Sequence, residues 1–281
     1  MQIEKLLIAM DLSQIKMVVT DMDGTLLNNN HEVSPLFYSL FEELKSLGVV
    51  FVAASGRQYY SIIDKLESIK DDIYVIAENG ALSMHKNIEL QTTGIDRQTY
   101  LELLEITKNL KDSQVILCGR KKGYLEDYGH EFITMFEEYF GRFEIVEDLQ
   151  DVVDDVYLKI AICNLKGSEE FLYPALKHLE DRLKVKVSGE MWLDLSHALA
   201  NKGYALKQLQ ERLEILPQET MVFGDYNNDL EMMGRATYSF AMENAHPNIK
   251  AAAQYTTKSN EENGVEYMLQ KMIEAKKKLD C

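Results

Sequence analysis

The stretch that decides the fold of this chain is Met17-Val18-Val19-Thr20-Asp21-Met22-Asp23-Gly24-Thr25-Leu26. Its apolar start predicts a buried strand, and Gly24 marks the turn that follows. Residues i and i+2 of an extended chain point the same way, so Asp21 and Asp23 are expected to share one pocket. Two carboxylates held this close repel, and a bound cation keeps at least one of them ionised. The pair predicts a site where one carboxylate attacks an electrophile and the other acts as acid and base, with a plain acidic turn as the alternative.

Strands and helices alternate after this stretch. Ser34-Pro35 is typical of a helix start, and the apolar run 49–54 predicts a strand that is covered on both faces. A further helix and a strand at 73–77 follow. Such alternation predicts an α/β fold with a doubly wound, Rossmann-like parallel sheet. Ligands of such sheets bind beyond the carboxyl ends of the strands.

The pattern changes in the middle of the chain. Between about residues 82 and 195, helical patterns mix with short strands that are typical of an antiparallel α+β module. The strand–helix alternation resumes after Asn201-Lys202-Gly203. We therefore expect a discontinuous core domain of residues 1–81 and 196–281, with an α+β domain of residues 82–195 inserted into it.

Polar residues follow the second and third predicted strands. Ser55 precedes a glycine and either caps a helix or binds a phosphoryl oxygen beside a helix N-terminus. Arg57 is a candidate anion contact, because a guanidinium binds phosphate through two parallel hydrogen bonds. A surface arginine is the alternative.

The returning core segment adds a lysine and two aspartates. Lys202 lies in the first turn of a predicted helix, where a cation opposes the helix dipole. Asp225 and Asp229 are four residues apart, so a helical turn would place both on one face. Magnesium, which takes oxygen ligands, would relieve their repulsion.

Four segments of the chain resemble the motifs of the haloacid-dehalogenase-like phosphatase superfamily: Asp21-Met22-Asp23-Gly24-Thr25-Leu26, Ala54-Ser55-Gly56-Arg57, Lys202-Gly203 and Gly224-Asp225-Tyr226-Asn227-Asn228-Asp229. The resemblance implies that Asp21 is a nucleophile that becomes aspartyl-phosphate and that Asp23 is the general acid and base. It implies that Lys202 neutralises charge on Asp21 and on the transferring phosphoryl group.

The resemblance also implies a cofactor and a substrate site. Mg²⁺ would be held by Asp21, Asp225, Asp229 and the backbone carbonyl of Asp23. The residues expected to bind substrate are Thr25, Ser55, Gly56, Arg57, Asn79 and Asn228. Because the insert follows the third strand, the chain is similar to the Cof-type, or IIB, branch, whose inserted domain closes over the core as a cap.

Composition limits the partners. The formal net charge of −16 argues against a nucleic-acid or anionic-membrane partner. Its uncharged stretches near the core strands are too short to cross a bilayer. Three cysteines without a Cys-x-x-Cys pair, and an N-terminus without signal-peptide features, predict a cytoplasmic protein. We expect a monomer or a weak homo-oligomer that acts on a small phosphate ester.

Several alternatives stay open. A phosphomutase of the phosphomannomutase type shares the motifs and the position of the insert. A receiver-like signalling module pairs similar residues around Mg²⁺ but lacks the Asp-x-Asp nucleophile. A binding protein with a degenerate site and a dehalogenase are further alternatives, although Asp23 argues against the latter. Sugar phosphates, pyridoxal phosphate and flavin-pathway phosphates are all candidate substrates.

Overall fold

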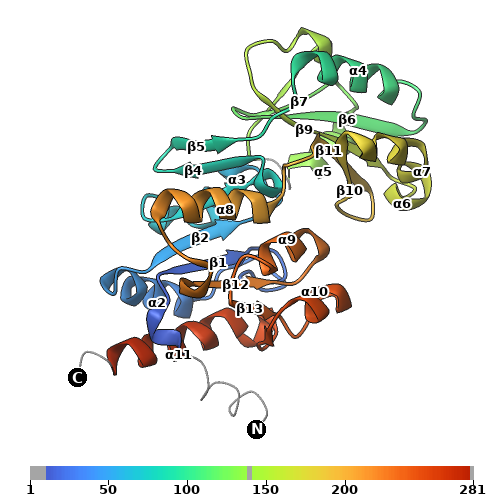
Figure 1. Ribbon diagram of the computed structural model, residues 1–281. Helices are drawn as coiled ribbons and strands as arrows, with labels where there is room; N and C mark the ends of the chain where they lie inside the picture. The colour runs from blue at the N-terminus through green and yellow to red at the C-terminus, as the bar shows by residue number, and fades with distance from the viewer. Residues whose placement is uncertain (1–10, 138–140, 279–281) are drawn as a thin grey trace.

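The computed structural model describes residues 11–137 and 141–278. Its chain forms two lobes, each built on a sheet of its own (Figure 1). The expectation about a signal peptide concerns mainly residues 1–10, which lie outside the described part. Within the described ranges, no helix has both the length and the apolar character needed to cross a membrane.

The larger sheet has eight strands in the order β14-β13-β12-β1-β2-β3-β4-β5. Its first six strands in this order are parallel, with register pairs such as Val19 with Val222 and Thr20 with Ala53. The parallel strands are β1 (Met17–Asp21), β2 (Val50–Ala54), β3 (Tyr74–Ala77), β12 (Thr220–Gly224), β13 (Tyr238–Ala241) and β14 (Tyr255–Thr256). This arrangement confirms the predicted doubly wound parallel core.

Two strands that we had expected in the insert belong to this core sheet. β4 (Leu82–His85) pairs antiparallel with β3, and β5 (Ile88–Thr92) pairs antiparallel with β4. The chain reverses at Gly80, whose φ of 93° is in the left-handed region that favours glycine, so β4 returns along β3. At the other end, residues 196 and 197 belong to a strand of the second sheet. We therefore propose that the inserted domain comprises residues 93–197.

Two pairs of core helices pack against each other. α2 contacts α11, and α8 contacts α9. Helix α2 begins where predicted, because the Ser34 hydroxyl accepts a hydrogen bond from the Leu36 amide at 3.1 Å. The helices are α2 (Pro35–Ser46), α3 (Tyr59–Lys65), α8 (Lys202–Leu213), α9 (Leu230–Met233), α10 (Pro247–Ala252) and α11 (Gly264–Lys277).

The second lobe contains a six-stranded sheet in the order β10-β11-β9-β6-β7-β8. It is antiparallel except for the pair β7 and β8, which confirms the predicted α+β character. Its strands are β6 (Ser113–Gly119), β7 (Gly123–Leu125), β8 (Phe143–Ile145), β9 (Tyr157–Asn164), β10 (Leu183–Val187) and β11 (Trp192–His197), and its α-helices are α4 (Arg97–Thr107), α5 (His130–Glu137), α6 (Ser168–Phe171) and α7 (Tyr173–Leu176).

The position of β1 explains where the site forms. β1 lies between β12 and β2, where the strand order reverses direction along the chain. Crevices in open α/β sheets form at such a point, beyond the carboxyl ends of the strands. Asp21 is the last residue of β1, and Ser55 directly follows β2.

Candidate active site

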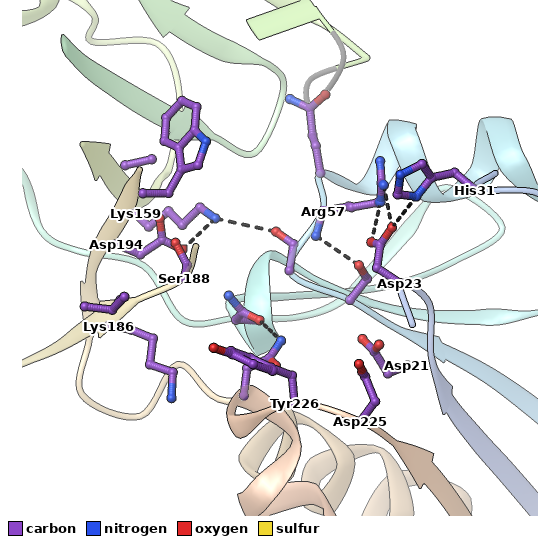
Figure 2. A pocket seen from close by; sticks show the side chains of 18 of the residues that line it. Asp21, Asp23, His31, Arg57, Lys159, Lys186, Ser188, Asp194, Asp225 and Tyr226 are labelled. Atoms are coloured by element: carbon purple, nitrogen blue, oxygen red, sulfur yellow. Dashed lines mark hydrogen bonds and ion pairs between the residues drawn. The ribbon is translucent and has the colours of Figure 1, made fainter. Parts of the chain in front are cut away.

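A cavity of about 790 Å³ lies beyond the carboxyl ends of the core strands. Figure 2 shows Asp21, Asp23 and Arg57 on the core side of this space, and Lys159, Lys186 and Asp194 on the side of the second lobe. The lining residues used below are Asp21, Asp23, His31, Ser55, Gly56, Arg57, Asn79, Lys159, Lys186, Ser188, Trp192, Asp194, Asp225 and Asn228. The cavity is thus shared between the two lobes.

Lys202 lies beneath the floor of the cavity, between two carboxylates. Its Nζ is 2.5 Å from Asp21 Oδ1 and 2.7 Å from Asp229 Oδ1, and its side chain is fully buried. Burial raises the pKa of Asp21 well above its usual value, although the Lys202 charge opposes this. Burial alone would lower the pKa of Lys202, but the two carboxylates raise it above the usual value. The lysine therefore stays charged and compensates Asp21.

A loop, and not a helical turn, brings Asp225 and Asp229 together, so the predicted helical stacking was wrong. Asp225 precedes the 3₁₀ turn Asn227–Asp229. Asp229 Oδ2 accepts hydrogen bonds from the backbone N–H groups of Asp225 (3.0 Å) and Tyr226 (3.3 Å). The Thr25 hydroxyl donates to Asp225 Oδ1 at 3.2 Å. The loop closes back on itself because Asp229 satisfies its orphan amides.

Three carboxylates form a set that fits a metal ion. Asp21, Asp225 and Asp229 each offer an oxygen, and these oxygens all lie within 4.8 Å of one another. Burial, and then the neighbouring Asp229 charge, raise the pKa of Asp225 to about 6. An all-oxygen set with repelling charges, of which two members are buried and Asp225 is half-buried, matches the preferences of Mg²⁺. The Asp23 carboxylate is not among these three.

Asp23 instead binds Arg57 through both carboxylate oxygens. Arg57 Nε is 2.6 Å from Oδ2 and its Nη2 is 2.5 Å from Oδ1 (Figure 2). His31 Nδ1 lies 3.1 Å from Oδ1. Burial would raise the pKa of Asp23, but the Arg57 and His31 contacts outweigh it and hold the pKa below its usual value. In this arrangement Asp23 is an ionised carboxylate.

The other predicted substrate-binding residues form one corner of the cavity. The Ser55 hydroxyl accepts a hydrogen bond from the Arg57 amide at 3.1 Å, and Ser55 is buried. Asn228 Nδ2 donates to Asn79 Oδ1 at 3.0 Å. A side chain on Gly56 would come within 3.1 Å of the Asn79 amide, so the absence of one keeps this corner open.

The structure divides the predicted residues into two layers. Those that line the cavity are Asp21, Asp23, Ser55, Gly56, Arg57, Asn79, Asn228 and Asp225. Thr25, Lys202 and Asp229 lie outside its lining. Thr25 donates to Asp225, and Lys202 bridges Asp21 and Asp229 from below. Thr25 thus supports Asp225, whereas we had expected it to contact substrate.

Sequence reasoning missed several residues of the cavity. His31 belongs to no motif, and Lys159, Lys186 and Trp192 come from the insert, where no motif identified them. One signal was present: Lys159 interrupts an apolar run in β9, whose residues are all buried. A lysine at a buried strand position implies a partner for its charge.

Fold and site together are those of a hydrolase of phosphoric monoesters, and comparisons with known proteins agree with this class. A family model described as haloacid dehalogenase-like hydrolase matches residues 18–269. The chain belongs to the haloacid dehalogenase-like hydrolase family, which confirms the prediction made from its motifs.

Three relatives illustrate the similarity. The 5-amino-6-(5-phospho-D-ribitylamino)uracil phosphatase of Escherichia coli (strain K12) is 32% identical over 92% of this chain and 96% of its own length. A solved structure from Streptococcus mutans UA159 is 30% identical with a TM-score of 0.83, over 91% of this chain and 98% of that one. The structure of a sugar phosphatase described as HAD subclass IIB shares the fold, with a TM-score of 0.78 at 21% identity over 91% and 98% of the two chains.

Proposed function

We propose that this protein is a Mg²⁺-dependent phosphatase of small phosphate monoesters that works through an aspartyl-phosphate on Asp21. The observation that carries the proposal is the position of Asp21: it lines the cavity together with Asp225, and Lys202 and Asp229 lie next to it beneath the floor. An attacking carboxylate must be ionised in a buried place. Lys202 favours the ionised form of Asp21, whereas the charges of Asp225 and Asp229 oppose it, and a metal ion held by the three carboxylates would remove that opposition.

The first step transfers the phosphoryl group to the protein. A carboxylate oxygen of Asp21 attacks phosphorus, and the bond between phosphorus and the ester oxygen breaks. Asp23 gives a proton to the departing oxygen, which leaves as an alcohol. In the second step Asp23 takes a proton from water, the water oxygen attacks phosphorus, and Asp21 and inorganic phosphate are released.

Asp23 must lose its contact with Arg57 during this cycle, because it has to carry a proton. The bidentate contact with Arg57 favours the ionised carboxylate, which cannot donate a proton. An arriving phosphoryl group offers Arg57 a second bidentate partner in the same cavity. We infer that Arg57 exchanges Asp23 for the substrate phosphate, so that Asp23 becomes free to hold the proton. Ser55, Asn79 and Asn228 orient the phosphoryl group from the other side.

Asp21, Asp225 and Asp229, with the Asp23 carbonyl, would hold the metal. When bound, Mg²⁺ supplies positive charge that stabilises the negative charge of the transferring group. Thr25 would keep the Asp225 carboxylate oriented through its hydroxyl.

The wall contributed by the insert would bind the leaving group. Lys186, Ser188 and Trp192 lie on this wall and offer a cation, a hydroxyl and an aromatic surface. The E. coli relative is named for a phosphate whose leaving group combines a ribityl chain with a uracil ring. We propose this compound as a candidate substrate, beside sugar phosphates and pyridoxal phosphate.

The test is release of inorganic phosphate from a panel of these monoesters, with Mg²⁺ and with EDTA. We expect metal-dependent release that Asp21→Asn abolishes, because the amide cannot attack phosphorus. Asp72→Asn is the matched control, since Asp72 is exposed and pairs with Lys45 on the surface.

Two outcomes would contradict the proposal. Absence of release from every ester, by folded protein with Mg²⁺ present, would remove the general phosphatase activity. Release that needs a bisphosphate activator, with isomerised sugar phosphate as the main product, would instead identify a phosphomutase.

A further inference from the structure

A lysine lies inside the apolar sheet of the insert. Lys159 is in the middle of β9, and only 6% of its surface is exposed. Burying an ammonium group is costly unless carboxylates and hydrogen bonds compensate its charge. A lysine in this position is therefore explained only by what its Nζ contacts.

Nζ of Lys159 reaches from the insert into the core. It is 3.0 Å from Asp194 Oδ2 on the neighbouring strand β11 and 3.0 Å from Glu78 Oε2 of the core. It also lies 3.5 Å from the carbonyl oxygen of Gly56, beside the phosphate-binding Ser55 (Figure 2). All three side chains of the cluster are buried. Neither carboxylate oxygen of Glu78 accepts a hydrogen bond from the described residues, so the ion pair with Lys159 is what compensates its buried charge.

Glu78 begins a turn with an unusual backbone. Glu78 and Asn79 have φ values of 50° and 53°, in the left-handed region, and Gly80 follows at 93°. Such conformations cost free energy for residues other than glycine and persist only where surrounding contacts impose them. The amide of Glu78 donates to the Arg57 carbonyl at 3.0 Å, and that of Asn79 donates to the Ser55 carbonyl at 3.0 Å.

The same turn touches the other parts of the site. Asn79 accepts the hydrogen bond from Asn228, next to the metal-ligand set. A side chain on Gly80 would come within 2.2 Å of the Asn201 carbonyl, directly before Lys202. The turn 78–80 therefore fixes the phosphate-binding segment 55–57, the loop of Asn228 and the start of α8 relative to one another.

We propose that Lys159 is a positioning residue that couples the seating of the inserted domain to the geometry of the phosphate-binding segment. When the insert is seated, Lys159 neutralises Glu78 and holds the turn 78–80 against residues 55–57. Asp194 holds the lysine in place from its own lobe. This inference rests on the proposed function, since it concerns how that site is arranged.

The following contacts between the lobes do not reach the turn 78–80. Gln58 and the backbone of Arg142 form two hydrogen bonds of 3.0 Å, and Lys184 pairs with Glu231 at 2.9 Å. These contacts join the lobes at other points than the turn 78–80. The position of Lys159 gives it an effect on the reaction beyond attachment of the domain.

The experiment compares Lys159→Met and Lys159→Arg with the wild type. Lys166→Met is the matched control, because Lys166 is also a lysine of the insert and pairs with Asp112 on the exposed surface. For Lys159→Met we expect kcat/KM to fall about 10²-fold, as for other small misplacements of a site. The fall should be equal for the smallest and the largest esters cleaved, and the inhibition constant of inorganic phosphate should rise. Lys159→Arg should recover part of the activity, and Lys166→Met should stay within about twofold of wild type.

A second readout does not depend on activity. Hydrogen exchange of the Glu78 and Asn79 amides should accelerate in Lys159→Met and not in Lys166→Met, because the proposal makes Lys159 hold their hydrogen bonds. If Lys159→Met does not fold, Glu78→Gln removes the same ion pair without leaving a buried cation unpaired, because Asp194 remains. It should give the same acceleration and the same pattern of kinetic loss.

Three results would overturn the proposal. The first is unchanged kinetics with unchanged exchange at the turn. The second is a loss confined to large esters, which would make Lys159 a contact for the leaving group. The third is slow exchange at the turn in Lys159→Met despite lost activity. A wild type without phosphatase activity would instead contradict the proposed function, and the exchange measurement would still decide the role of Lys159.

Discussion

Two buried carboxylates share one ammonium beneath the cavity. Lys202 contacts both Asp21 and Asp229, and none of the three side chains has more than slight exposure. Buried charges of this kind contribute little net stability as a group, but loss of one member leaves the others uncompensated.

Replacing Lys202 by Met should affect stability and activity together. Two buried carboxylates would then face each other without a cation, so unfolding should become easier by about 3–5 kcal/mol. Activity should fall by about 10²–10³-fold because charge on the transferring group loses a partner. Urea unfolding and phosphate release measure these effects. Lys207→Met on the same helix, which removes only the exposed pair with Glu211, is the control. Activity within tenfold of wild type would contradict the assigned role.

Binding of Mg²⁺ should release a proton. Burial and the neighbouring Asp229 raise the pKa of Asp225 to about 6 in the protein without metal, and the metal binds only the ionised form. Below that pKa the affinity for Mg²⁺ should therefore rise about tenfold per pH unit, and it should level off above about pH 7. Calorimetric titration in buffers of different ionisation enthalpy measures both affinity and proton release. Equal affinity at about pH 5 and about pH 7 would show that Asp225 is already ionised before binding.

At the scale of elements, short turns connect the strand ends into one site. The strands β1, β2 and β12 bring the candidate residues to one edge, but the turn 78–80 sets the distances between them. Its glycine illustrates the constraint. Gly80 combines a left-handed φ with a close approach to the Asn201 carbonyl, so both its conformation and its lack of a side chain are used.

Gly80→Ala should therefore destabilise the protein more than the matched substitution Gly129→Ala. Gly129 has a similar φ of 89°, but a side chain there would meet nothing within 4 Å. Gly129→Ala should cost about 1 kcal/mol, the price of the left-handed conformation alone. Gly80→Ala adds a steric clash and should cost about 3 kcal/mol, with reduced kcat because Lys202 moves. Thermal unfolding and phosphate release compare the two. Equal effects would mean that the contact with Asn201 relaxes freely.

The elements of the core could be predicted because each carries a local signal. The apolar runs at 49–54 and 73–77 and the Ser34-Pro35 helix start all lie where the structure has β2, β3 and α2. β4 and β5 were missed because they have no such signal. β5 is a half-exposed edge strand that contains Glu89 and Gln91. The pairing of β4 with β3 depends on the reversal at Gly80, and that of β5 with β4 on the turn at Lys86-Asn87. Tertiary context, not propensity, decided these strands.

The same distinction applies to the site. Residues at the ends of the core strands could be predicted from motifs and from the geometry of parallel sheets. Contacts across the two lobes could not, because the partners of Lys159 lie 81 positions before it and 35 after it in the numbering. The contact of Arg57 with Asp23, on which its proposed exchange of partners rests, also could not be predicted from the motifs.

At the scale of the whole molecule, the two lobes have separate cores. The buried apolar clusters of the second lobe consist of residues between Ile95 and Leu195. Among the buried members of the core-sheet cluster, one residue, Leu158, comes from that range. Each lobe also has its own sheet. This separation agrees with our proposal that residues 93–197 form a domain.

A fragment of residues 93–197 should fold by itself. Its sheet and its clusters are complete without the core, and Lys159 keeps Asp194 as a partner. Circular dichroism and dispersed amide resonances should show a folded α+β domain with cooperative thermal unfolding. As a control, the fragment 1–92 should not fold, because β1 would lack β12 at its side. A fragment 93–197 without cooperative unfolding would contradict the proposed division.

The pairing of β1 with β12 also determines when the core can fold during synthesis of the chain. Asp21 and Lys202 are 181 positions apart, so a ribosome that adds about 5–20 residues per second needs about 10–40 s between them. During that interval the insert emerges whole and can complete its own sheet. The nascent core meanwhile leaves the side of β1 that later pairs with β12 exposed. The enzyme acquires its chemistry only when the last quarter of the chain has left the ribosome.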